Sequence, residues 1–278
     1  MSQSSENEVR QKTRSAQQIN NKYNIGHLTA GYNKSKNKEK IRYKLIQGKK
    51  PVTIIFLHGF MSDLTGKKIQ VLSKLSKKEQ VSFLGLEYTG HGKSSGQLSD
   101  YGIDDWINQS KELIEKVVKT KKIILVGSSM GAWIGIALIS KLKKIVKGFV
   151  GIASAPDFTK EIMWKNFSKK TKSMIKSGRT YYMPSSYGNP YPISKKLIFD
   201  RSKHLVLNKK IKCNFPVRLF HGLKDTVVDV NFSIRLTKTL LSNDSIITFQ
   251  NNGDHSLSQT EDLKKIKNQL TNLIKDSC

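Results

Sequence analysis

The sequence has only two cysteines, no long apolar run and no apolar segment near its N-terminus. Cys213 and Cys278 are too few and too far apart for a disulfide framework or a zinc cluster, which is typical of a reducing compartment. No stretch approaches the roughly 20 apolar residues that a membrane-spanning helix needs. We therefore expect a soluble cytoplasmic protein. A mitochondrial matrix location would require the N-terminus to act as a transit peptide, and Glu6 and Glu8 argue against one.

Acidic residues are also scarce: 49 Lys and Arg stand against 21 Asp and Glu, a net charge of +28. Of the basic residues 42 are Lys and 7 are Arg, and Arg is the residue preferred for contacts to phosphates and bases, so nucleic acid is not the expected partner. The excess lies mainly in residues 1–50, net +9, and residues 158–212, net +12. Either the second segment meets an anionic membrane surface, or the charge is a compositional bias of solvated faces.

Short apolar runs alternate with amphipathic stretches from residue 51 onward. The runs are β-branched and continuous, which is typical of strands buried on both faces of a parallel sheet. Ile103 to Val118 follows helical spacing, and Gly131 to Ile139 is apolar nearly all round, as in a helix buried against a sheet. This alternation predicts a mostly parallel, doubly wound α/β sheet. The expected strands are Val52–Leu57, Val81–Leu86, Lys122–Val126, Gly148–Ser154, Phe215–Phe220 and Ser245–Gln250, with a closing helix over Thr260–Lys275.

Two segments depart from this pattern. Residues 1–24 are polar without hydrophobic periodicity and are expected to form a mobile extension. Residues 158–212 are rich in lysine and aromatics, with a loop-like centre over 183–192, and are expected to form a cap inserted into one domain of residues 25–278.

The motif Gly127-Ser128-Ser129-Met130-Gly131 fits G-x-S-x-G and joins an expected strand to the buried helix. That context predicts a nucleophile elbow, in which a tight turn lifts the serine above the sheet and the helix N-terminus faces the developing oxyanion. The register makes Ser129 the nucleophile. The N–H of Met130 is then one donor of an oxyanion hole, and Phe60, in His58-Gly59-Phe60 after the first clear strand, supplies the other.

Ser129 needs a base and an orienting acid later in the chain. His255 follows the last expected strand and fits the base, whereas His221 at the end of a strand is expected to be structural. Asp225 gives the chain order serine, acid, histidine and is the preferred acid; Asp157 and Asp254 are the alternatives. The segment Gly90-His91-Gly92-Lys93-Ser94 is locally similar to a phosphate-binding loop, but Glu87 stands where that motif needs glycine.

Five motifs follow one another along the chain: His58-Gly59-Phe60, Gly90-His91-Gly92-Lys93-Ser94, Gly127 to Gly131, His221-Gly222-Leu223-Lys224-Asp225 and Gly253-Asp254-His255. In these motifs and their order the chain resembles the α/β-hydrolase superfamily, from about residue 25 to its C-terminus. Three further segments, Met61 to Gly66, Ala155 to Thr159 and Ser186 to Ile193, resemble the branch of the mitochondrial palmitoyl-protein thioesterase and acyl-glucuronide esterase with their bacterial relatives. This resemblance implies hydrolysis of an acyl ester or thioester by a Ser–Asp–His triad without a metal or cofactor.

The expected activity is therefore that of a serine hydrolase on acyl esters or thioesters, as an acyl-protein thioesterase or a carboxylesterase. The aromatic and methionine side chains of the cap either line an acyl pocket or pack the cap onto the body: Trp164, Phe167, Tyr181, Tyr182 and Met183. Two other classes are a catalytically silent scaffold and a peripheral membrane or nucleic-acid binding protein that acts through its basic cap and N-terminal arm.

Overall fold

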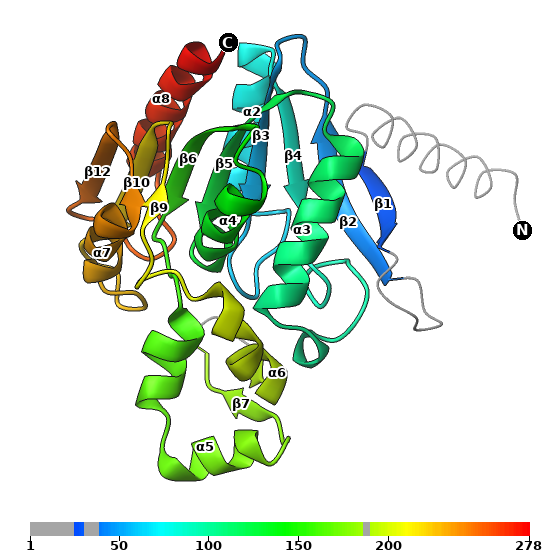
Figure 1. Ribbon diagram of the computed structural model, residues 1–278, viewed down its shortest axis with the longest axis vertical. Coiled ribbons are helices and arrows are strands. Elements are labelled where there is room, and N and C mark those ends of the chain that lie inside the picture. Colours follow the sequence, from blue (N-terminus) through cyan, green and yellow to red (C-terminus); the bar gives the residue numbers. More distant parts are fainter. Residues whose placement is uncertain (1–24, 31–38, 186–189) are drawn as a thin grey trace, which may run out of the picture.

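The computed structural model describes residues 25–30, 39–185 and 190–278 (Figure 1). The predicted N-terminal extension, residues 1–24, lies outside them. Within these residues an eight-stranded sheet has the order β1-β2-β4-β3-β5-β6-β10-β12. Strand β2 is antiparallel to both of its neighbours, and the strands from β4 to β12 are parallel. The strands are β1 Ile25–Ala30, β2 Glu39–Ile46, β3 Val52–Leu57, β4 Ser82–Leu86, β5 Lys122–Ser128, β6 Val146–Ile152, β10 Val217–Gly222 and β12 Ser245–Gln250.

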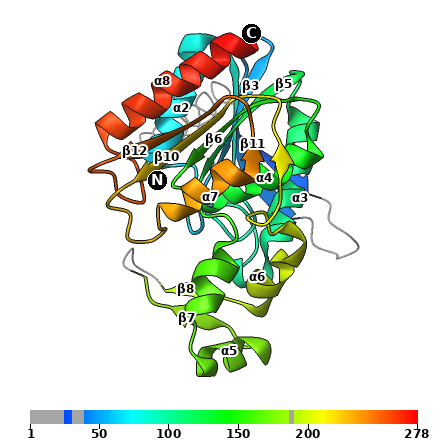
Figure 2. The same ribbon diagram turned by 60° about the vertical axis from the view of Figure 1, so that its left-hand side comes forward.

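Helices cover both faces of this sheet, so the predicted doubly wound architecture is confirmed (Figures 1 and 2). Buried apolar residues form one cluster with α3 and α4, which includes Trp106 and Trp133, and a second cluster with α2 and α8, which includes Leu72 and Leu270. All six side chains of β3 are buried, which explains its unbroken apolar sequence. The helices are α2 Lys67–Glu79, α3 Ile103–Val117, α4 Met130–Lys141, α7 Asn231–Thr239 and α8 Thr260–Ser277.

The strands and helices expected from the sequence are present within a few residues of their predicted ends. The structure adds elements that the sequence pattern did not predict: the antiparallel strands β1 and β2, and helices α2 and α7. Strand β2 was not predicted because charged residues such as Glu39, Arg42 and Lys44 are frequent among its eight residues, although Ile41 and Ile46 are buried. No helix in the described ranges is long and apolar enough to cross a bilayer.

A group of short elements lies beyond the carboxyl ends of the parallel strands, and we call it the cap, residues 159–204 (Figures 1 and 2). The expectation of a loop over 183–192 is wrong at its ends, because β7 and β8 pair antiparallel from Tyr181 with Ile193 to Met183 with Tyr191. Residues 186–189 between them lie outside the described part. The cap contains the π-helical segment η2 Thr159–Trp164, α5 Lys169–Lys176, β7 Tyr181–Met183, β8 Tyr191–Ile193, α6 Lys195–Phe199 and the 3-10 segment η3 Asp200–His204.

Candidate active site

Ser129 lies at a sharp turn between β5 and α4. Its backbone has φ of 53° and ψ of −117°, a conformation that residues other than glycine rarely adopt. The turn is fixed by the N–H of Ser129, which donates to the carbonyl of Ile152 at 2.9 Å, and by its carbonyl, which accepts from Ala132 and Ala155 at 3.0 and 3.2 Å. The strained turn thus places the Ser129 hydroxyl at the carboxyl ends of the central strands.

The two glycines of the motif allow a close approach of backbone segments around this turn. A Cβ atom on Gly127 would lie 2.4 Å from the Cα atom of Ala132, and one on Gly131 would lie 2.0 Å from the carbonyl oxygen of Leu57. Neither contact is possible for a residue with a side chain. The spacing of the G-x-S-x-G motif is therefore a packing requirement of the turn between β5 and α4.

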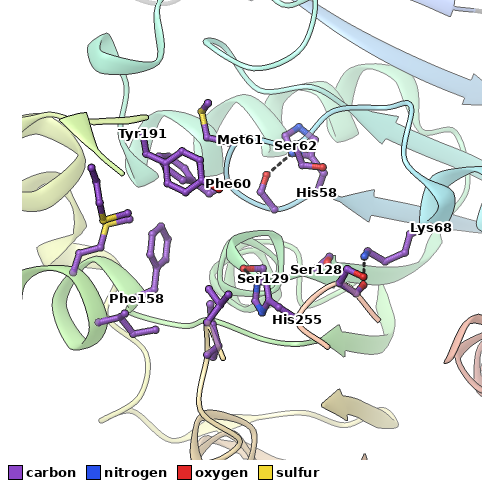
Figure 3. Close-up of a pocket in the computed structure, with 18 of the residues that line it drawn as sticks. His58, Phe60, Met61, Ser62, Lys68, Ser128, Ser129, Phe158, Tyr191 and His255 are labelled. Carbon is purple, nitrogen blue, oxygen red and sulfur yellow. Dashed lines mark hydrogen bonds between the residues drawn. The ribbon is translucent and has the colours of Figure 1, made fainter. Parts of the chain in front are cut away.

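His255 lies in the loop after β12, beside Ser129 (Figure 3), and it connects this serine to Asp225. Its Nε2 atom is 3.1 Å from Ser129 Oγ and accepts the hydroxyl hydrogen, while its Nδ1–H donates to Asp225 Oδ2 at 2.7 Å. The side chain of His255 is 18% exposed and that of Asp225 is 0% exposed. The structure thus brings together the three residues that the sequence singled out as nucleophile, base and acid.

The environment of Asp225 keeps its carboxyl ionised. Its Oδ1 atom accepts from the backbone N–H groups of Val227 and Val228 at 2.8 and 2.9 Å. Burial opposes ionisation, but the hydrogen bonds from His221 and His255 outweigh it and hold the pKa of Asp225 well below its usual range. An ionised Asp225 requires a proton on Nδ1 of His255, which leaves Nε2 as an acceptor toward Ser129.

His221 has a part in this site that the sequence did not indicate. It is the second-last residue of strand β10 and is fully buried. Its Nε2–H donates to the carbonyl of Val228 at 2.9 Å, and Asp225 Oδ2 lies 3.3 Å from the same nitrogen. Its Nδ1 accepts from the hydroxyl of Ser233 at 2.7 Å. The expectation that His221 is structural stays a prediction, and its ring also contacts the carboxylate of Asp225.

The two alternative acids have other partners. The buried carboxylate of Asp157 accepts from the backbone N–H of Leu207 at 3.0 Å and so holds the chain where it returns from the cap; burial raises its pKa. Asp254 accepts from the N–H of Leu257 at 3.0 Å within its own loop. Of these three carboxylates, the one hydrogen-bonded to His255 is that of Asp225.

The two predicted oxyanion donors flank the serine. Met130 is the first residue of α4, so its N–H has no carbonyl one turn earlier in the helix to bond to. Phe60 follows Gly59, where a Cβ atom would lie 3.4 Å from Ser129 Cβ and 4.0 Å from Ser129 Oγ. The segment after β3 therefore passes directly beside the serine, and Phe60 lines the same cavity as Ser129.

A cavity of about 560 Å³ opens at Ser129 between the body and the cap. Figure 3 shows Phe60, Phe158 and Tyr191 on one side of Ser129, and Lys68 with Ser128 on the other. One side of the cavity is thus aromatic and the other is polar. Cap residues of the apolar wall are Ile162, Met163, Phe167, Met183 and Tyr191.

Of the five cap residues named from the sequence, two line the cavity and three do not. Phe167 and Met183 line the cavity. Trp164 instead packs against Phe199 with ring centroids 5.1 Å apart, and Tyr181 packs against Phe167 at 5.5 Å. The ring of Tyr182 is 64% exposed.

The glycine-rich segment after β4 surrounds a carboxylate of the chain itself. The buried Glu87 accepts from the N–H of Lys93 at 2.7 Å and from the N–H of Leu64 at 3.0 Å, and Arg42 donates to it at 3.2 Å. A Cβ atom on Gly92 would lie 2.4 Å from the Glu87 carboxyl carbon. This agrees with the rejection of a phosphate-binding loop. Over residues 25–30, 39–185 and 190–278, no group of three or more His, Cys, Asp or Glu side chains is placed to hold a metal ion.

Comparison with known proteins gives relatives that span most of the chain. Rat palmitoyl-protein thioesterase ABHD10, mitochondrial, is 28% identical over 237 residues, which cover 84% of this chain and 78% of the relative. A crystal structure of a hydrolase from Agrobacterium vitis S4 superposes with a TM-score of 0.85 at 28% identity, covering 90% of this chain and 98% of that one. Mouse alpha/beta hydrolase domain-containing protein 10 superposes with a TM-score of 0.78 at 26% identity, covering 91% and 98%.

The model of the family described as serine aminopeptidase, S33, matches residues 48–196, more than half of the chain. The matched segment contains the Ser129 turn and the first part of the cap. Together with the parallel sheet, this match shows that the chain is a hydrolase of the α/β-hydrolase fold and belongs to the serine aminopeptidase S33 family.

Proposed function

We propose that this protein hydrolyses acyl esters or thioesters through an acyl-enzyme on Ser129. The observation that carries the proposal is the continuous hydrogen-bond chain from Asp225 through His255 to Ser129, which ends in a cavity with an apolar wall. Nucleophile, base and orienting acid in this geometry are the parts that acyl transfer needs. The relatives named as palmitoyl-protein thioesterases support the reaction class.

In the first half of the reaction, Ser129 Oγ attacks the acyl carbonyl carbon while His255 Nε2 takes the hydroxyl proton. The carbonyl oxygen becomes an oxyanion that the N–H groups of Phe60 and Met130 stabilise, typically by a few kcal/mol per donor. Asp225 holds the ring of His255 and stabilises the imidazolium. Collapse of the tetrahedral intermediate breaks the bond to the alcohol or thiol, which receives its proton from His255.

In the second half, water replaces the leaving group. His255 removes a proton from the water as its oxygen attacks the acyl carbon, and the same N–H groups stabilise the second oxyanion. Collapse releases the carboxylic acid and returns the proton to Ser129 Oγ. No step of this proposed mechanism uses a cofactor or a metal.

The cavity favours an apolar acyl group over a polar one. The walls contributed by Phe60 and Phe158 from the body and by Phe167 and Met183 from the cap would bury an alkyl or aryl group beside Ser129. The leaving group would then extend toward the polar side near Lys68. In this proposal the predicted insertion, residues 158–212, contains the cap of residues 159–204, which supplies part of the acyl site. The cytoplasmic location stays a prediction.

The test is hydrolysis of paired ester and thioester substrates that share one acyl chain, over a series of chain lengths. Wild type should turn over at least one series, and Ser129→Ala should lower kcat by several orders of magnitude. Ser140→Ala, on the exposed far end of the same helix α4, is the matched control and should keep wild-type rates. Activity that survives in Ser129→Ala would contradict the proposal, whereas the ester-to-thioester ratio identifies the leaving group.

A specific feature of the cap favours a second role, docking on an anionic membrane. Helix α5 buries Ile175 and leaves Lys169, Lys170 and Lys176 exposed, at the end of the cap far from the sheet (Figure 1). Lysines near an anionic surface contribute about 1 kcal/mol each to membrane attraction. Such docking would bring the cavity close to acyl groups carried at a membrane.

A further inference from the structure

Lys68 is a charged side chain that hydrogen-bonds to two residues of the loop that carries His255. It is the second residue of α2, half-buried, and lines the polar side of the cavity. Its ammonium donates to the backbone carbonyl of Ser256 and to Ser258 Oγ, the latter at 3.1 Å. Ser256 is the residue directly after His255, so Lys68 connects α2 to the loop that carries the base.

The loop of His255 is held by contacts from several elements, among them the N–H of Lys224, which donates to the carbonyl of Gly253 at 2.9 Å. Leu257 has φ of 44°, a left-handed conformation that costs energy in a residue with a side chain, so the loop needs contacts that hold it in this form. Asp254 supplies one from inside the loop by accepting from Leu257 N–H. Lys68 supplies one from outside, across almost 190 residues of sequence, and charge-assisted hydrogen bonds are the strong ones.

We propose that Lys68 is a positioning residue that holds the loop of His255 so that Nε2 stays within hydrogen-bond reach of Ser129. This inference rests on the proposed function of Ser129 and His255. Lys68 acts on the reaction through His255 and takes no proton itself. Removing the ammonium should leave the cavity intact but let His255 move away from Ser129, and displacements of about 1 Å at reacting groups can reduce rates by about 100-fold.

The electrostatic surroundings of Lys68 give this role a pH signature. Burial lowers the pKa of Lys68 to about 8. The carboxylates of Asp254 in the loop and Asp262 in α8 act in the opposite direction and raise it, but burial has the larger effect. The ammonium therefore loses its proton as the pH rises through about 8, and a neutral amine donates weaker hydrogen bonds. Wild type should lose part of its kcat above this pH. An arginine at position 68 stays protonated and should keep its kcat to higher pH.

The experiment compares steady-state kinetics of wild type, Lys68→Met and Lys68→Arg on a short neutral ester. Lys68→Met keeps the length of the side chain without its charge and should lower kcat by about 10- to 100-fold with little change in KM. Lys68→Arg should recover most of kcat and lack the decline above pH 8. Lys67→Met, one residue earlier on the exposed face of α2, is the matched control and should match wild type.

Each other outcome has a definite meaning. Wild-type kcat in Lys68→Met overturns the positioning role, and so does a rise in KM at constant kcat, which would place Lys68 on the substrate instead. If Lys68→Met unfolds, Ser258→Ala is the second variant, because it removes one hydrogen-bond partner of the ammonium. It should lower kcat by about two- to tenfold at an unchanged melting temperature. If kcat does not decrease in Ser258→Ala, the proposal is overturned. Activity retained by Ser129→Ala is a separate result, because it refutes the proposed function and leaves Lys68 without a base to position.

Discussion

Two histidines buried beside the active site should make the stability of the fold sensitive to acid. His58 and His91 are 1% and 3% exposed and lie in one cluster with Tyr88 and Trp106. Their Nδ1 atoms contact carbonyl oxygens, of Gly59 at 2.8 Å and of Thr89 at 3.2 Å, whereas both Nε2 atoms are buried without a hydrogen-bond partner among the described residues. A second proton on either ring would therefore create a buried charge with an unpaired N–H.

Burial lowers the pKa of His58 to about 4, and burial together with the neighbouring His58 lowers that of His91 to about 3. The value for an unfolded histidine is 6.5, so between these values the unfolded chain binds more protons than the folded chain. Above about pH 7 the two histidines therefore do not reduce the free energy of unfolding. As the pH drops below 6.5 they reduce it. Between pH 8 and pH 5 each histidine should lower the free energy of unfolding by about 2 kcal/mol, because at pH 5 its ring is almost fully protonated in the unfolded chain and not in the folded chain.

His91→Phe isolates one of these contributions. Phenylalanine fits the aromatic cluster, and the carbonyl of Thr89 still accepts from Trp106 Nε1 at 3.1 Å after the change. Urea unfolding followed by tryptophan fluorescence at pH 8 and pH 5 gives the two free energies of unfolding. The variant should lose about 2 kcal/mol less than wild type between these pH values. Other titrating groups contribute equally to both proteins and cancel in the difference.

A second neutral replacement guards against a simple packing effect. His91→Gln should show the same reduced pH dependence as His91→Phe, even where the two variants differ in stability at pH 8. If both variants lose as much stability as wild type between pH 8 and pH 5, the folded pKa of His91 is not lowered, and the argument from burial fails.

Three further predictions concern activity and binding. Asp225→Asn should lower kcat by about 10⁴-fold while the fold is kept, because the amide no longer holds the tautomer in which His255 Nε2 accepts from Ser129; steady-state kinetics and circular dichroism check both parts. Ile162→Trp should fill the apolar end of the cavity and shift the preferred acyl chain to shorter lengths, measured as kcat/KM over an ester series. The triple change Lys169→Glu, Lys170→Glu and Lys172→Glu should abolish salt-sensitive binding to anionic vesicles and leave hydrolysis of a short neutral ester unchanged; equal vesicle binding by variant and wild type would refute docking through α5.

The parts of the site that follow the sheet were predictable from the sequence. Carboxyl ends of parallel strands share one edge, so a serine after β5 and an acid and a histidine after β10 and β12 had to lie near one another. The glycines around Ser129 could be recognised because they stand at a fixed spacing within five residues, although the contact that excludes a side chain at Gly131 comes from Leu57 in β3. Local geometry of this kind is visible in sequence.

Contacts made by buried polar side chains between distant elements were not predictable. Lys68 was one of 42 lysines, and nothing in the pattern of α2 distinguishes it from the exposed Lys67 beside it. Its partners lie almost 190 residues away. The segment of the cap departs from the sheet pattern in the sequence. Its short elements could not be predicted, because lysines that face solvent and apolar residues that face the cavity give no clear helical or strand periodicity.

The two histidines that contact Asp225 show why composition alone cannot assign roles. Both follow or end a strand at the same edge of the sheet, and both place a ring nitrogen near the same carboxylate oxygen, at 2.7 Å for His255 and 3.3 Å for His221. His221 has both nitrogens occupied, one by Val228 and the other by Ser233, in a fully buried position. His255 is partly exposed and its second nitrogen faces Ser129. In the proposed mechanism His255 moves the proton because, of these two histidines, it is the one with a nitrogen directed at the Ser129 hydroxyl, while His221 contacts the carboxylate that orients His255.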